Sequence, residues 1–118
     1  MSTEQVPVDL SLELKSVPVV LGGVPFSLVE LTGESRDKYM TEMSQRMKYD
    51  GKGKPTGLKS YNGLQAMLLT LCLRDQTGEA VKAADIQKYP SSAQNKLFEM
   101  AQEMNGLGEL GEEEAKNE

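Results

Sequence analysis

Three sets of residues could take part in chemistry, judged by residue type and spacing. They are one cysteine, one glycine- and lysine-rich loop and one pair of glutamates. Cys72 is the single cysteine in 118 residues, and the chain has no histidine. A Ser-His-Asp triad, a Cys-His pair and a Cys/His metal cluster therefore cannot form. Cys72 falls on an apolar stripe and is predicted to be a buried small hydrophobe. Glu99 and Glu103 lie four residues apart and indicate a solvated helix face, so no acid–base site is predicted.

The loop at residues 51–57, with the sequence GKGKPTG, resembles phosphate-binding loops only in composition. A P-loop requires Ser or Thr after its Gly-Lys pair, and here Pro55 follows Lys54. The dinucleotide fingerprint needs glycine where Thr56 stands, and a strand before the loop instead of a helix. No catalytic residue, cofactor site or metal site is therefore predicted.

Basic residues surround this loop. Span 46–59 has five bases against one acid, whereas the whole chain carries a net charge of −5. Tyr49 is the only aromatic residue among these bases, so nucleic-acid binding is disfavoured. The favoured interpretation is a solvated connector or a contact with an acidic protein, and a nucleic-acid-associated regulator remains the alternative. The bases are Arg46, Lys48, Lys52, Lys54 and Lys59.

The elements that would position these residues begin with a β-hairpin over 17–28, because two β-branched runs flank Gly22-Gly23. Pro18 and Pro25 predict that both of its strands lie at sheet edges. Residues 8–14 also alternate apolar and polar side chains. They are either a third strand or an arm that pairs with a neighbouring chain.

Helical spacing then dominates the sequence. A first helix is predicted from Thr32 or Gly33 through Met47, ending in the loop 49–57, and a second from about Ser60 to Arg74. Asp75-Gln-Thr-Gly78 is predicted to form a turn, and a short helix over 83–88 ends before Pro90. A last helix begins with Ser91 and Gln94 as a capping box and ends at Gly106. The second helix is predicted to supply the centre of the core through Leu64, Met67, Leu68, Leu71 and Cys72.

The predicted fold class is therefore α+β, mostly helical, with three to four helices and an N-terminal β-hairpin. Residues 17–106 are predicted to form the one domain, after an N-terminal arm over 1–16. Residues 107–118 contain five acids and few apolar side chains, and they are predicted to be a disordered tail. The sequence has no signal peptide and no stretch long enough to span a membrane, which favours an intracellular protein.

Methionine is frequent, and all six internal methionines fall on predicted helices. They are either flexible core filler or an adaptable surface that accepts helical partners. The hypothesis for protein binding names Met40, Met43, Met47, Leu97, Phe98, Met100 and Met104. The hypothesis for self-association names four residues of the hairpin: Val19, Leu21, Phe26 and Leu28.

The string at residues 19–33, VVLGGVPFSLVELTG, resembles the opening of tail assembly chaperones from phages with long non-contractile tails. The likeness continues through residues 57–65, 71–75 and 86–90 and through Leu97-Phe98. It covers residues 17–106, and its order and spacing are more specific than any one string.

This resemblance implies a non-enzymatic protein of the host cell cytoplasm. It would bind the tape measure protein, keep it soluble, help recruit tail tube protein and be absent from the virion. The family commonly self-associates into rings or spirals, and many members have a longer form made by ribosomal frameshifting. The alternative is a structural head–tail or tail completion protein, which mass spectrometry of purified virions would detect.

Overall fold

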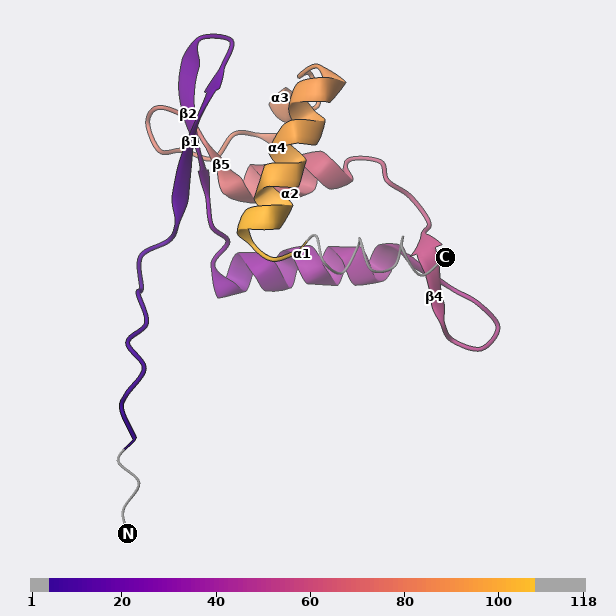
Figure 1. Cartoon of the computed structure of the whole chain (residues 1–118). Coiled ribbons are helices and arrows are strands. Elements are labelled where there is room, and N and C mark those ends of the chain that lie inside the picture. Colours follow the sequence, from indigo (N-terminus) through magenta and orange to yellow (C-terminus); the bar gives the residue numbers. More distant parts are fainter. Residues whose placement is uncertain (1–4, 108–118) are drawn as a thin grey trace.

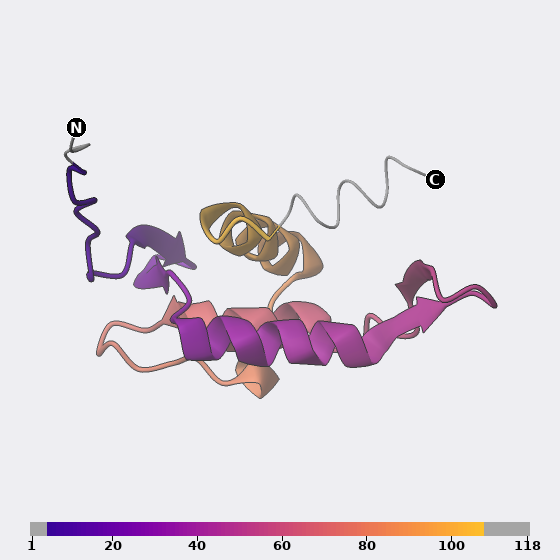
Figure 2. The ribbon, with the colours of Figure 1, turned by 90° about the horizontal axis from the view of Figure 1, so that it is seen from below.

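The computed structural model describes residues 5–107 and has an α+β fold (Figure 1). The described chain forms, in order, β1 (Ser16–Leu21), β2 (Val24–Val29), α1 (Gly33–Arg46), β3 (Met47–Tyr49), β4 (Pro55–Leu58), α2 (Leu64–Cys72), β5 (Leu73–Arg74), α3 (Ala83–Ile86) and α4 (Ser91–Met104). Seen from below, α1 and α2 lie side by side, with α4 in a second layer beside the hairpin (Figure 2). The N-terminal hairpin and the four helices confirm the predicted fold class. The predicted tail lies outside the described residues, except for Leu107.

The N-terminal hairpin closes through Gly22 and Gly23, which have φ angles of 57° and 79°. Positive φ at both turn positions matches the twist of two antiparallel strands and costs glycine no steric strain. β1 and β2 pair antiparallel, and β5 adds a third strand beside β2, so the strand order is β1-β2-β5. The third strand therefore comes from the end of α2, and the described residues of the alternating segment 8–14 form no strand.

Helix α1 begins as predicted. The Thr32 hydroxyl accepts a hydrogen bond from the Ser35 amide at 3.1 Å, and Glu34 lies in the first turn. The helix ends at Arg46, one residue earlier than expected, and Met47 belongs to β3. β3 and β4 form a second hairpin where the sequence predicted a connector. Its turn forms because the Asp50 side chain accepts hydrogen bonds from two backbone amides of the glycine-rich loop.

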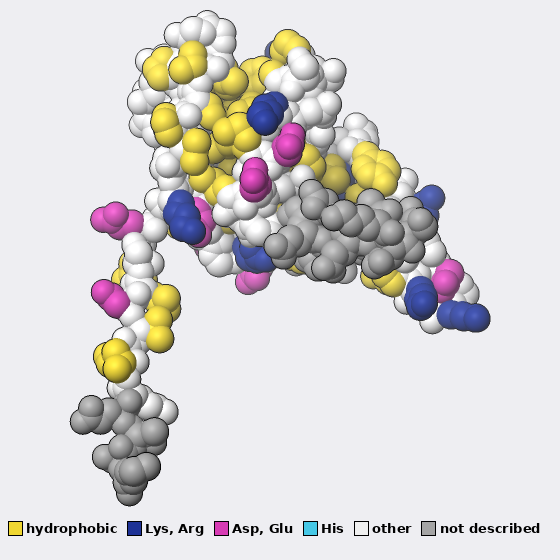
Figure 3. All heavy atoms as spheres, viewed as in Figure 1, with side chains coloured by type: hydrophobic (Ala, Val, Ile, Leu, Met, Phe, Trp, Pro, Cys, Tyr) yellow, Lys and Arg dark blue, Asp and Glu magenta, His cyan; other side chains and the backbone are white. Residues whose placement is uncertain are grey.

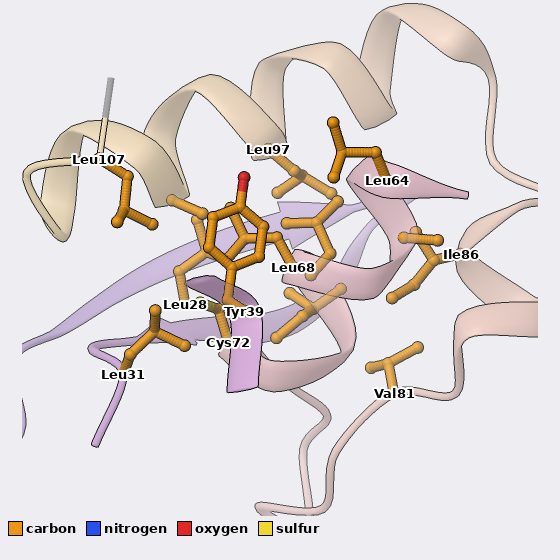
Figure 4. Close-up of a cluster of buried hydrophobic side chains, with 14 residues drawn as sticks. Leu28, Leu31, Tyr39, Leu64, Leu68, Cys72, Val81, Ile86, Leu97 and Leu107 are labelled. Atoms are coloured by element: carbon orange, nitrogen blue, oxygen red, sulfur yellow. The ribbon is translucent and has the colours of Figure 1, made fainter. Parts of the chain in front are cut away.

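Helix α2 is the centre of the core (Figure 4). Five of its nine residues are buried, among them Leu68, Leu69 and Cys72, which are fully covered. It ends at Cys72 instead of Arg74, because Leu73 takes an extended backbone and pairs with Leu28 of β2. Side chains from β2, α1, β5, α3 and α4, and from the segments next to them, complete the cluster: Leu28, Leu31, Tyr39, Leu73, Val81, Ile86, Leu97, Ala101 and Leu107.

The capping box predicted for α4 is wrong. Pro90 is the N-cap, Ser91 is already helical, and no side-chain cap bond forms. The Gln94 side chain instead donates to the Ile86 carbonyl at 3.2 Å, which connects α4 to the end of α3. The predicted stop at Gly106 is confirmed by its φ of 65° and by the Leu107 amide bonding to the Gln102 carbonyl at 2.8 Å.

Asn105 joins three parts of the fold at the end of α4. Its side-chain oxygen accepts a hydrogen bond from the Leu31 amide at 2.9 Å, and its amide nitrogen donates to the Ala101 carbonyl at 2.8 Å. The same nitrogen lies 3.8 Å from the Cys72 sulfur, and the Asn105 carbonyl accepts from Arg36 at 2.8 Å. One side chain thus links the β2–α1 junction to α4 and α2.

Asn105→Ala is expected to lower the free energy of unfolding by about 1–3 kcal/mol, because the largely buried Leu31 amide loses its acceptor. Urea unfolding followed by circular dichroism measures this change. Asn95→Ala is the control on the same helix, since the exposed Asn95 makes one surface bond to Gln65. A loss no larger for Asn105→Ala than for Asn95→Ala would contradict the linking role.

Residues 5–15 lie ahead of β1 and are exposed throughout. Figure 1 shows this arm leaving the base of the hairpin and running away from the helices. Within residues 5–107, no helix combines the length and the apolar content that crossing a bilayer demands.

Candidate protein-binding groove

A groove of about 560 Å³ is lined by α1, α2 and α4, by β4 and the segment that follows it, and by Gln87 after α3. Its lining includes the apolar or aromatic side chains of Met43, Leu58, Leu64 and Phe98. The complete lining is Tyr39, Met43, Gly57, Leu58, Tyr61, Asn62, Gly63, Leu64, Gln65, Gln87, Gln94, Phe98 and Gln102. None of these residues carries a charge at neutral pH.

Two helices supply opposite walls through simple spacing. Tyr39 and Met43 are four residues apart on α1, so they face the same side. Gln94, Phe98 and Gln102 are likewise spaced by four on α4 and alternate amide, aromatic and amide groups along the groove. The walls are therefore regular helix faces, held on the core by α2.

Arg46 holds the segment between β4 and α2 that lines part of the groove. Its guanidinium donates to the Asn62 carbonyl at 2.7 Å and to the Ser60 carbonyl at 3.4 Å, and it pairs with Glu42 at 3.2 Å. The Lys59 amide also bonds to the Arg46 carbonyl at 2.6 Å. Arg46 is thus a structural member of the predicted basic span, whereas Lys48, Lys52, Lys54 and Lys59 are exposed.

Neutral carboxamides line the groove together with the exposed ring of Tyr61, and we call these carboxamides the amide rim: Asn62, Gln65, Gln87, Gln94 and Gln102. Gln65 donates to Asn95 at 2.7 Å, which connects α2 to α4 along one edge. Carboxamides both donate and accept hydrogen bonds, so such a rim can meet polar side chains of a partner without selecting for their charge. A lining of apolar and uncharged amide side chains is suited to an amphipathic segment. In residues 5–107, no three Cys, Asp or Glu side chains gather to hold a metal ion.

Tyr39, which lines the groove, and Cys72 in the core have shifted pKa values. Burial raises the pKa of the Tyr39 hydroxyl to about 12, with a further rise from Cys72 and an opposing effect of Arg46. Burial also raises the pKa of the Cys72 thiol to about 11, against smaller opposing effects of Arg74 and Asn105. Both groups are therefore neutral at physiological pH, and Cys72 is buried as the sequence predicted.

These shifts predict a loss of stability in alkali. Ordinary values are 9.0 for the thiol and 10.0 for the phenol, so above pH 9 the unfolded chain releases protons that the folded chain retains. The contribution of these two groups to the free energy of unfolding should therefore be constant near neutral pH and fall as pH rises above 9 towards 12. Thermal unfolding across this range measures the fall. Cys72→Ala should delay its onset towards pH 10, and an unchanged onset would contradict the assignment to Cys72.

The predicted protein-binding residues lie in different places. Met43 and Phe98 line the groove, whereas Met40 is on α1 outside the groove lining and is 37% exposed. Met47 is a half-buried residue of β3. The prediction that Leu97 binds a partner is corrected by its burial. Leu97 is only 3% exposed, because its side of α4 packs onto α2 in the core.

Met100 and Met104 lie in a second hollow of about 250 Å³ between α4 and the inner face of the hairpin, together with Val17, Leu28 and Glu103. Figure 3 shows hydrophobic side chains gathered on the hairpin and between it and α4. The groove and this hollow are therefore two separate apolar surfaces.

The four predicted self-association residues share the inner face of the hairpin, which is turned towards the helices. Val19, Leu21 and Phe26 are half-buried against the core. Leu28 is fully buried and cannot contact a partner, which corrects its inclusion. The outer face instead carries Ser16, Pro18 and Val20.

Sequence reasoning missed the amide rim and the residues that follow β4. A period of four in Gln94, Phe98 and Gln102 was a visible signal for one wall. Tyr61, Asn62 and Gln87 had no such signal, because loops carry them to the groove.

Comparisons with protein-family models, with curated proteins and with solved structures found no match.

Proposed function

We propose that the chain is a phage tail assembly chaperone that binds an amphipathic helical segment of the tape measure protein in the groove. The observation that carries this proposal is a groove whose uncharged lining combines the apolar side chains of Met43, Leu58 and Phe98 with neutral carboxamides. The resemblance over residues 17–106 supplies the identity of the client. In this role the protein is non-enzymatic, acts in the host cell cytoplasm, recruits tail tube protein and leaves before the virion is complete.

A helix is the favoured form of the client because tape measure proteins of this class are largely helical. A helix without its tube exposes an apolar stripe, and side chains at positions i, i+3 or i+4 and i+7 can anchor it in a groove. Met43 lends adaptability, since its unbranched thioether side chain fits differently shaped neighbours. The amide rim tolerates charged and neutral flanking residues alike, which suits a long client with a varied surface.

Co-expression with the tape measure gene of the same phage tests the proposal. The tape measure protein should move from the insoluble to the soluble fraction and co-purify with the chaperone. Expression of the tape measure protein alone is the reference, and Met43→Gln is the variant expected to lose rescue. No rescue and no complex would refute the proposal. Stoichiometric amounts of this chain in purified virions would favour the tail completion alternative.

A further inference from the structure

The N-terminal arm exposes a row of aliphatic side chains. In residues 6–14 these side chains alternate with proline or polar residues, and their exposed fractions range from 45% for Leu14 to 97% for Leu12. Figure 3 shows hydrophobic groups along this arm, away from the body of the protein. A row of this kind marks a surface that a partner covers. Its members are Val6, Val8, Leu10, Leu12 and Leu14.

The period of this row is two, which is the period of a β-strand. In a strand, all five aliphatic side chains would share one face, and Pro7, Asp9, Ser11 and Glu13 would share the other. The arm itself has no strand partner among residues 5–107. It therefore has the pattern of a strand that is completed by pairing with a sheet edge.

The free edge of the three-stranded sheet is β1. The opposite edge is occupied, since Arg74 of β5 bridges to Ala80 and the Val81 amide bonds to the Leu73 carbonyl at 3.1 Å. Just before β1, the Lys15 carbonyl accepts a hydrogen bond from the Glu30 amide at 2.8 Å. Hydrogen-bonded and non-bonded residues alternate along an antiparallel pair, so the residues of β1 that bond to β2 are the odd-numbered ones. The backbone groups of Ser16, Pro18 and Val20 consequently point outward.

Pro18 lacks an N–H, so this edge offers the amides of Ser16 and Val20 and three carbonyl groups. The bonds that hold β1 to β2 are unaffected by this proline. An added strand would thus be held by fewer hydrogen bonds than an interior one, which favours reversible pairing.

The inner face of the sheet matches the aliphatic row of the arm. Next to β1 this face contains the hollow lined by Val17, Met100 and Met104. The outer face at this edge carries the exposed residues Ser16, Pro18 and Val20. A strand added beside β1 can turn its aliphatic row towards the hollow, and its polar row then lies on the outer face.

In its own chain the arm runs away from this edge (Figure 1). Both backbone groups of Lys15 bond to Glu30, through the Lys15 amide to the carboxylate at 3.0 Å and through its carbonyl. Lys15 is thereby held in line with β1. Folding back would need a tight turn at Leu14-Lys15-Ser16, where no Gly, Asn or Asp is present.

We propose that the arm of one copy, residues 6–14, adds as a β-strand to the free edge of β1 in a second copy and covers the hollow beside α4. The partner is another molecule of this chain. This pairing uses neither the groove nor the client, so it stands independently of the proposed function.

Self-association of the full chain tests the proposal by analytical ultracentrifugation. The wild-type protein should form dimers or larger assemblies at raised concentration. Leu10→Asp should raise the dissociation constant by at least about tenfold. Ser11→Asp is the matched control, because it adds the same charge on the polar row, and it should leave the constant within about twofold. A monomeric wild-type protein, or equal effects of the two variants, would overturn the proposal.

The β1 edge is tested from the other side by Val20→Pro, which removes an outward amide that the β1–β2 ladder does not use. It should abolish self-association, and mixing it with Leu10→Asp should restore a 1:1 dimer through the intact arm and the intact edge. Hydrogen exchange of the wild-type Val20 amide gives the same information without a variant. Its exchange should slow as concentration rises, and concentration-independent exchange would overturn pairing at β1.

Discussion

Replacing Leu68 by alanine is expected to lower the free energy of unfolding by about 2–5 kcal/mol. Leu68 is fully buried in the middle of α2, the helix that contacts α1, α3 and α4. The substitution removes apolar contacts on several sides and leaves a cavity that the surrounding helices can fill only in part. Because a small domain has only about 5–15 kcal/mol of stability in total, this one change should remove a large share of it.

Urea unfolding followed by helix circular dichroism measures this effect as a lower midpoint with an unchanged slope. Leu68→Met is the control, since it nearly conserves volume and should cost less than about 1.5 kcal/mol. If the alanine and methionine variants unfolded at the same midpoint, Leu68 would not occupy the central position described here.

Met43→Gln is expected to weaken binding of the tape measure segment by about tenfold or more. Met43 lines the groove, and the burial of one such side chain against a partner contributes about 1.5–3 kcal/mol, where 1.4 kcal/mol corresponds to a factor of ten. Phe98→Gln on the opposite wall should have an effect at least as large, because the aromatic ring presents more apolar surface. Fluorescence anisotropy with labelled tape measure peptides measures both dissociation constants.

Met40→Gln is the matched control for this prediction. It makes the same substitution on the same helix, but Met40 is 37% exposed and is not part of the groove lining. Its dissociation constant should stay within about twofold of the wild-type value. Equal losses for Met40→Gln and Met43→Gln would show that the client binds elsewhere on α1.

Local signals in the sequence predicted most elements of the fold. Gly22-Gly23 determines a two-residue turn, Thr32 caps a helix and Gly106 ends one, and each effect requires only a few neighbouring residues. The buried stripe of α2 followed from its apolar composition. Predictions failed at helix ends, where the backbone of a residue can either continue the helix or pair with a strand. Leu73 was predicted to be helical but pairs with Leu28, and Met47 was predicted to be helical but pairs with Leu58.

The candidate site was predicted only in part. Met43 and Phe98 were named from helical spacing, and both line the groove. The same spacing could not show that Leu97 is buried and Phe98 accessible. Adjacent residues on a helix point in directions about 100° apart, and the burial of each depends on which element packs against it. Gln94 illustrates the converse, since its local pattern indicated a cap and its actual partner is the Ile86 carbonyl of a different helix.

The sequence by itself determined the N-terminal hairpin, the four helices, the apolar centre in α2 and the alternation of the arm, because composition and periodicity are properties of the chain alone. It also excluded histidine chemistry and disulfide bonding within the chain. Only the tertiary structure decided which apolar side chains remain accessible, since that depends on how α4 and the hairpin pack on α2. The packing leaves Met43 and Phe98 open in a groove, closes Leu28 and Leu97 into the core, and leaves the edge of β1 free.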